Sequence, residues 1–145
     1  MISFFVPGVP KPGGSKTGFY NKKLNRVMIV DASKNRDWKA VIKDCALQTL
    51  KNVAPWTCPV ILNVEFRMPR PKNHFGSGKN KDKIKDSSPP YPAGKPDCLK
   101  LARCLEDALT GILWRDDAQI VQEHIYKVYS PRPGAQVQVT VATPP

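Results

Sequence analysis

The sequence predicts an α+β fold, a single small domain spanning residues 1–145 in which a mixed β-sheet carries two main helices. Its 145 residues suffice for one buried core but not for two. Several segments alternate apolar and polar residues with the period of a strand, and two others repeat apolar residues at helical spacing. A hydrophobic content of 41% and a charged content of 24% argue against wholesale disorder.

Short segments with the alternation and turn-rich boundaries that are typical of strands recur along the chain. The second and third form a hairpin around the polar turn 21–25, and Pro-Gly or proline-rich turns end the first and separate the last two. The predicted strands are Ile2–Val6, Thr17–Tyr20, Arg26–Val30, Pro59–Met68, Gln119–Tyr129 and Gln136–Val141.

The first predicted helix begins near Ser33, a plausible N-cap. Its apolar positions recur at helical spacing, and Trp38 among them is interpreted as a core residue rather than a base-stacking platform. The expected core positions are Trp38, Val41, Ile42, Cys45 and Leu50, and the expected solvent positions are Lys34, Arg36, Lys39 and Lys43.

The second predicted helix runs from about Asp97 to Leu109 and is stopped by Gly111. Its polar face contains one misfit, Leu99. The apolar face comprises Cys98, Leu101, Ala102, Leu105, Ala108 and Leu109, and the polar face Lys100, Arg103, Glu106 and Asp107.

A formal net charge of +11 and a pI of 9.7 indicate a polyanionic partner, with nucleic acid as the default. Charge alone also fits a ribosome-associated or membrane-surface protein. Residues 1–43 carry nine bases against two acids, and residues 70–95 carry seven against two. In contrast, six acids fall within residues 97–123: Asp97, Glu106, Asp107, Asp116, Asp117 and Glu123.

Two basic loops are candidates for DNA contact. The glycine-rich loop 10–16 lacks the spacing of a nucleotide-binding P-loop, so phosphate contact and a simple linker both remain open. The non-periodic stretch 69–94 is either a DNA-contacting loop or an inert insertion, and its lysines favour contact. The expected DNA-binding residues are Lys11, Lys16, Lys72, Lys79, Lys81, Lys83, Lys85 and Lys95.

The four cysteines form no CxxC pair, and His74 and His124 are far apart, which argues against a structural zinc site. No stretch resembles a signal peptide or is long enough to cross a bilayer. We therefore expect a cytoplasmic protein with reduced thiols, no membrane association and no organic cofactor.

The acids at residues 97 and 116–117 admit two interpretations. Singly, Asp97 fits a helix cap and Asp116-Asp117 a solvated turn. Together, carboxylates at a helix N-terminus and at a strand edge can converge on Mg²⁺, or Mn²⁺, through hard oxygen ligands. In a basic protein this predicts metal-assisted phosphodiester hydrolysis, with Arg103 or Lys95 as a nearby cation that stabilises the transition state.

The stretches VPGVPKPGGSK, RPKNHFGSG, KPD, EDALTG and WRDDAQIV resemble the RusA-like Holliday junction resolvases of bacteria and their phages. The resemblance covers nearly the whole chain. It implies a homodimeric, Mg²⁺-dependent endonuclease of recombination and repair that makes paired nicks in four-way DNA junctions. It also implies metal ligation by Asp97 and Asp117, with Asp116 adjacent, and an essential cation at Arg103.

One departure concerns position 99, where the family usually has a second aspartate and this sequence has Leu99. Glu106 and Glu65 are weak candidates to replace that ligand, since Glu106 lies roughly 10 Å along the helix axis from position 99. A catalytically weakened protein that still binds branched DNA is therefore the alternative. An unrelated RNA- or ribosome-binding module is the third hypothesis, and the clustered acids argue against it.

Overall fold

The computed structural model describes residues 1–14, 16–31 and 33–145, without the side chains of residues 16, 17, 19, 29–31 and 33–35. The elements in chain order are β1 (Ile2–Pro7), β2 (Lys16–Asn21), β3 (Arg26–Asp31), α1 (Ser33–Leu50), β4 (Val60–Met68), α2 (Cys98–Leu109), β5 (Ile120–Tyr129) and β6 (Gly134–Val141), with short 3₁₀ turns η1 (Lys72–His74), η2 (Gly78–Asn80) and η3 (Asp117–Gln119). None of the described helices is long and apolar enough to span a membrane.

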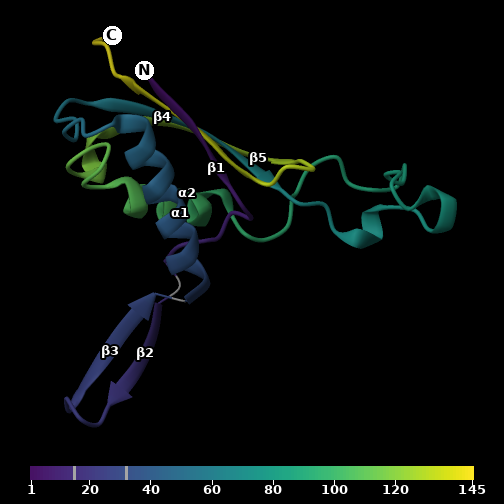
Figure 1. The fold of residues 1–145 in the computed structure, drawn as a ribbon, viewed down its shortest axis with the longest axis horizontal. Coiled ribbons are helices and arrows are strands. Elements are labelled where there is room, and N and C mark those ends of the chain that lie inside the picture. Colours follow the sequence, from purple (N-terminus) through teal and green to yellow (C-terminus); the bar gives the residue numbers. More distant parts are fainter. Residues whose placement is uncertain (15, 32) are drawn as a thin grey trace.

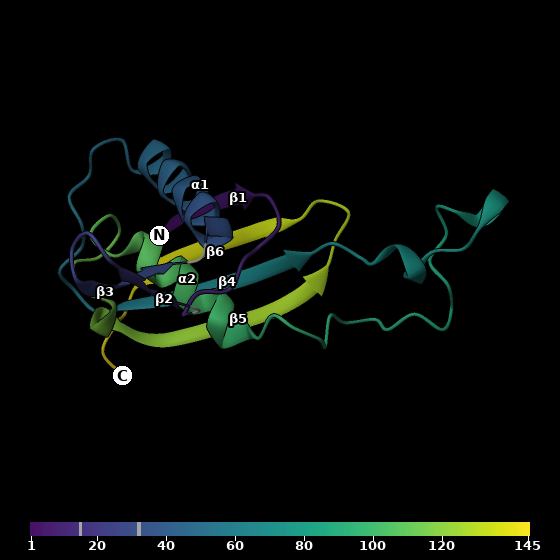
Figure 2. The same ribbon diagram turned by 90° about the horizontal axis from the view of Figure 1, so that it is seen from below.

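A four-stranded sheet in the order β1-β6-β4-β5 forms one layer of the molecule. The β4–β5 pair is parallel and the other pairs are antiparallel, so the sheet is mixed as predicted. Both helices cover the same face of this sheet, as Figures 1 and 2 show from two directions. The predicted α+β class with two helices on one mixed sheet is therefore confirmed.

The core lies between that sheet face and the two helices. Alternate residues of β4, from Val60 to Met68, point into it, because successive strand side chains face opposite sides of a sheet. Trp38 and Ile42 of α1 are buried there, which confirms Trp38 as a core residue, and Trp114 closes the core beyond α2.

Three predicted positions in the helices are wrong. Val41 is exposed rather than inward, and Lys39 is not solvated, because its side chain is only 16% exposed and lies against α2. On α2 the fully buried cysteine is Cys104, whereas Cys98 is only partly buried. An α-helix that packs on both a sheet and another helix buries a wider face than a single apolar stripe, and this explains both Cys104 and Lys39.

Two segments extend away from the layered body in Figure 1. The predicted hairpin is confirmed as β2–β3, with Lys16 opposite Asp31 and Asn21 opposite Arg26. The second segment is the connection 69–97, which contains η1, η2 and an isolated bridge between Phe75 and Ile84. It is an ordered loop without long elements, as its lack of periodicity predicts.

Candidate active site around helix α2

Helix α2 runs antiparallel to β5, and both of its ends are fixed by polar contacts to that strand. At its start, Lys127 Nζ of β5 donates hydrogen bonds to the carbonyl oxygens of Gly94 and Pro96, at 2.8 and 2.9 Å. Toward its end, the carboxyl groups of Glu106 and Glu123 share a hydrogen bond. The two lysine bonds fix the backbone directly before Asp97, so Lys127 positions that carboxylate.

Asp97 occupies the N-cap position of α2, but within the described residues its side chain makes no capping hydrogen bond. Of the two interpretations of Asp97, the helix cap is therefore not supported by a hydrogen bond. The carboxylate is 59% exposed, and Lys100 Nζ lies 3.8 Å from Oδ2. An exposed carboxylate beside the positive end of the helix dipole, whose ion pair with Lys100 is also exposed, can still bind a cation or water.

The glycine-rich loop packs on α2 beside its cations. Gly13 donates its backbone N–H to the Lys100 carbonyl oxygen at 2.7 Å. A Cβ added at Gly13 would lie 2.8 Å from the Cys104 backbone nitrogen, so only glycine permits this approach. Gly14, with φ +82°, lies against the Arg103 side chain. The sequence leaves phosphate contact and a simple linker open as roles for this loop. Its packing adds a third role, because the loop supports the turn of α2 that contains Arg103.

The turn before β5 is built around Gln119. Its Oε1 accepts the backbone N–H groups of Arg115 and Asp116 at 2.9 and 3.0 Å, while its Nε2 donates to the carbonyls of Trp56 and Cys58. Asp116 Oδ1 accepts the N–H of Ala118 at 2.8 Å and completes a capping box. Asp116 is therefore engaged in the backbone, whereas Asp117 is exposed at the tip of the turn.

Glu106 is the most perturbed acid near the site. Partial burial, the hydrogen bond from Glu123, and the negative charges of Glu123, Asp117 and Asp107 raise its pKa to about 8. Glu106 is therefore the acid near the site that retains its proton most readily as the pH rises. Glu123 belongs to the acidic cluster of the sequence, but no role is predicted for it there. The alternation of β5 places it on the helix-facing side with Ile125 and Lys127, and this signal could have identified it.

The predicted acids do not all come together. Asp97 lies at the end of α2 that Lys127 contacts. The negative charge of Asp117 instead raises the pKa of Glu106. Glu106 lies nine residues after Asp97, which corresponds to about 14 Å of axial rise along the helix. Within residues 1–14, 16–31 and 33–145, no three His, Cys, Asp or Glu side chains are close enough together to hold a metal ion. Carboxylate oxygens are the donors Mg²⁺ prefers, but a complete set is not assembled among these residues.

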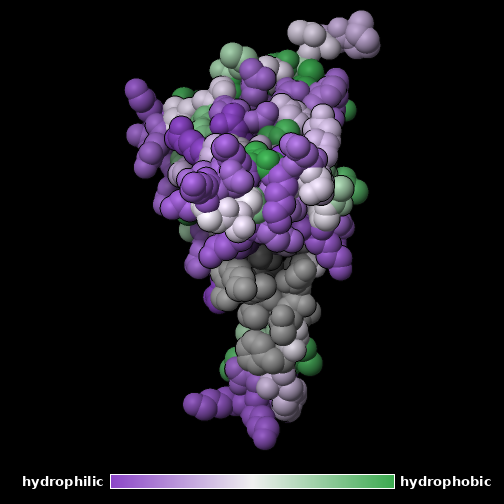
Figure 3. Space-filling model, turned by 90° about the vertical axis from the view of Figure 1, so that its right-hand side faces the viewer, coloured by the Kyte–Doolittle hydropathy of each residue, from purple (hydrophilic) through white to green (hydrophobic). Residues whose placement is uncertain are grey.

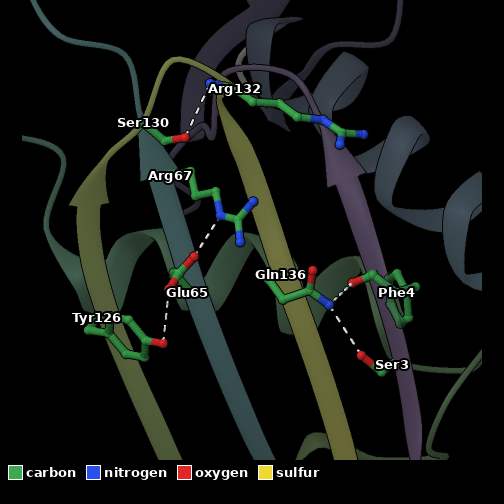
Figure 4. A network of polar contacts seen from close by, with 8 residues as sticks. All are labelled: Ser3, Phe4, Glu65, Arg67, Tyr126, Ser130, Arg132 and Gln136. Carbon is green, nitrogen blue, oxygen red and sulfur yellow. Dashed lines mark hydrogen bonds and ion pairs between the residues drawn. The ribbon is translucent and has the colours of Figure 1, made fainter.

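Neither candidate replacement for the position-99 ligand is supported. Leu99 is 76% exposed beside Asp97, as the misfit on the polar face predicts. Glu65 lies on the sheet face opposite α2, where it accepts hydrogen bonds from Arg67 Nε and the Tyr126 hydroxyl (Figure 4). The carboxyl group of Glu106 is already hydrogen-bonded to Glu123.

Asp107 also departs from its predicted surroundings. Its place on the polar face predicts Lys100 and Arg103 as neighbours, but its Oδ2 lies 3.6 Å from Lys39 Nζ of α1. Asp107 therefore ties the two helices together, and its charge is directed away from Asp97.

The predicted DNA-binding lysines are distributed over several surfaces. Lys72, Lys79, Lys81, Lys83 and Lys85 are exposed along the extended connection, and Lys85 Nζ donates to the Asn73 carbonyl oxygen. Lys95 lines a pocket together with Pro96 and Lys127, and Lys11 lines another together with Trp38. The side chain of Lys16 lies outside the described residues.

The fold is that of a small basic α+β domain whose mixed sheet carries a helix with exposed acid and base, followed by an acidic turn before a strand. Residues 7–140 match the model of the family described as endodeoxyribonuclease RusA. The chain therefore belongs to the RusA family of Holliday junction endodeoxyribonucleases. It is also 29% identical over 138 residues to the uncharacterised protein YqaN of Bacillus subtilis (strain 168), a match covering 95% of this chain and 94% of YqaN.

Proposed function

We propose that this protein is a divalent-metal-dependent endodeoxyribonuclease that binds four-way DNA junctions as a homodimer and hydrolyses phosphodiesters near the crossover. The observation that carries this proposal is Asp97, an exposed carboxylate that caps nothing and lies on the same helix as Arg103. Family membership and the net charge of +11 support it. A two-fold symmetric dimer suits a substrate that is cut in pairs.

We propose Asp97 and Asp117 as the carboxylates that would hold Mg²⁺, or Mn²⁺, with water and DNA phosphate completing the ligand set. Because the two acids lie toward opposite ends of α2, they would share one ion only after a rearrangement on DNA binding. Bound there, the ion would supply a water molecule of lowered pKa and stabilise charge on the phosphate. Asp116 is the weaker candidate of the two neighbours, because its Oδ1 already caps η3. Arg103 would contribute a fixed positive charge toward the reacting phosphate, held in place by the packing of Gly14.

The second candidate is a RusA-family protein that binds branched DNA without cutting it. Leu99 and the absence of a three-acid group among the described residues favour this alternative. The two functions share the DNA-binding surface and differ only in cleavage.

Cleavage of a synthetic four-way junction with and without Mg²⁺ tests the proposal. Asp117→Asn should reduce the cleavage rate by about 100-fold or more, because loss of supporting partners alone typically costs about 10–100-fold at metal sites. The matched control is Asp116→Asn, which retains a good cap and should cut nearly as well as wild type. Junction binding without cleavage would reject the nuclease in favour of the second candidate.

Leu99→Asp separates the two candidates further. Leu99 is 76% exposed, so its replacement should change stability by no more than about 0.5 kcal/mol. A large gain in Mg²⁺-dependent cleavage would show that the missing carboxylate limits activity. An unchanged rate in a variant that binds DNA normally would show that position 99 is not part of the site.

A further inference from the structure

The β2–β3 hairpin extends from the body, and no sheet or helix of the described part of the chain lies over it (Figure 1). An isolated two-stranded hairpin is at best marginally stable in water, so a protein seldom retains one without a use for it. Its six-residue strands span about 20 Å, which corresponds to roughly six base-pair steps along a duplex.

The tip of this hairpin concentrates positive charge. Lys22, Lys23 and Arg26 lie within five residues, no acid is present among residues 20–27, and all three side chains are exposed. Figure 3 shows hydrophilic side chains gathered at this free end. Leu24 and Val27 are exposed beside them, at 54% and 63%. Neighbouring like charges repel each other, so such a tip is best accommodated by a polyanion.

Side-chain hydrogen bonds order the tip before any partner binds. Asn21 Oδ1 accepts the backbone N–H groups of Lys23 and Leu24 at 3.0 and 3.2 Å, and the Tyr20 hydroxyl donates to Asn25 Oδ1. Asn25 adopts φ +48°, a conformation that asparagine tolerates better than most residues. A preformed tip loses less conformational entropy on binding.

The hairpin starts next to the candidate active site. β2 begins two residues after Gly14, which lies against Arg103 on α2. The basic tip is therefore tethered about one strand length from the Gly14–Arg103 contact on α2. A two-stranded ribbon fits the major groove, and exposed lysines at its tip reach the flanking phosphates.

We propose that the β2–β3 hairpin is a DNA-contacting ribbon that binds the phosphates of a duplex arm beside the active site through Lys22, Lys23 and Arg26. This inference rests on the proposed function, because the duplex arm belongs to the proposed junction substrate. The hairpin cations are additional to the lysines of loops 10–16 and 69–95.

The salt dependence of junction binding tests the proposal. In Lys22→Ala/Lys23→Ala, the slope of log affinity against log salt concentration should fall by up to about 1.8, or about 0.9 for each phosphate that is no longer neutralised. The matched control is Arg36→Ala/Lys43→Ala, which removes the same charge from exposed positions on α1 and should leave the slope nearly unchanged. Equal slopes for wild type and the hairpin variant, or equal decreases in the two variants, would overturn the inference.

Cross-linking provides a second readout that does not depend on charge. A photoreactive phenylalanine analogue at Leu24 should cross-link to labelled junction DNA, whereas the same group at Leu47 of α1, which is equally exposed, should not. No cross-link at Leu24 in a protein that binds the junction would overturn the hairpin role alone. If wild type fails to bind the junction at all, the proposed function fails together with the inference. If the protein binds the junction and cross-links through the hairpin but does not cleave it, the proposed nuclease activity is wrong and the hairpin contact stands.

Discussion

The two ends of α2 carry similar carboxylates in opposite electrostatic surroundings. At the first end Asp97 is exposed, with Lys100 3.8 Å away and Lys127 fixing the preceding backbone. At the second end Glu106 faces Glu123 and feels the charges of Asp117 and Asp107, and its pKa rises to about 8. Residue type alone therefore does not define an active-site acid, because neighbours decide whether a carboxyl group is charged and available.

Among variants that act by positioning, the largest effect is expected from replacing Lys127, which fixes the backbone at the first end of α2. Lys127→Met keeps the partly buried stem but leaves the Gly94 and Pro96 carbonyls without their donor. We expect junction cleavage to fall by about 10–100-fold through misplacement of Asp97, with little change in junction affinity. Single-turnover cleavage at saturating protein, compared with binding by gel shift, measures the two separately.

A matched control for this variant is Lys43→Met, an exposed lysine of α1. It should cut and bind like wild type. Equal decreases of affinity and cleavage in Lys127→Met would contradict a positioning role and indicate a direct DNA contact instead.

The next largest effect is expected at the turn before β5, which carries Asp117 and is held by Gln119. Gln119→Leu removes four hydrogen bonds and leaves the Trp56 and Cys58 carbonyls without their side-chain donor. We expect a loss of about 2–3 kcal/mol in the free energy of unfolding. Urea denaturation measures it, and Gln122→Leu, at an exposed position on β5, is the control. A decrease below about 0.5 kcal/mol would show that the turn does not depend on Gln119.

A smaller effect, on the pH dependence of stability, is expected from the raised pKa of Glu106 at the second end of α2. The pKa of Glu106 lies at about 8 in the folded protein, above its ordinary value of 4.5, so the folded state binds the proton more tightly. The associated stability is complete below about pH 4.5 and is lost as the pH rises through about 8. Partial burial limits this contribution to about 1–2 kcal/mol.

Glu106→Gln should therefore remove part of the decline in unfolding free energy between about pH 4.5 and 8, as measured by urea denaturation at several pH values. Asp82→Asn serves as the control, because Asp82 is an exposed acid of the connection 69–97 and is not among the groups that raise the pKa of Glu106. A wild-type stability that rises through this pH range, with the same slope in Glu106→Gln, would be incompatible with a raised pKa of Glu106.

The smallest effect concerns the Lys39–Asp107 ion pair, which ties the second end of α2 to α1. The Nζ–Oδ2 distance is 3.6 Å and the Asp107 side chain is 47% exposed. A double-mutant cycle with Lys39→Met and Asp107→Asn should give a coupling of about 0.2–1 kcal/mol. A coupling indistinguishable from zero would show that helix packing alone joins α1 and α2.

The sequence by itself determined the fold class, the strands, the hairpin and the course of both helices. Period-two alternation and helical spacing are local properties, and they place Val60–Met68 and Cys98–Leu109 correctly because each segment must bury one face. It also identified Leu99 as an apolar misfit, since an exposed leucine on a polar helix face is visible from spacing alone.

Only the tertiary structure decided which charged groups meet. Sequence spacing relates Asp97 to residues on its own helix, but Lys127 lies 31 positions from Pro96 and reaches its carbonyl because β5 runs antiparallel to α2. The Glu106–Glu123 pair and the Lys39–Asp107 bridge likewise join different elements. Electrostatic interactions depend on distance through space, and the packing of helix on sheet, rather than order along the chain, sets that distance.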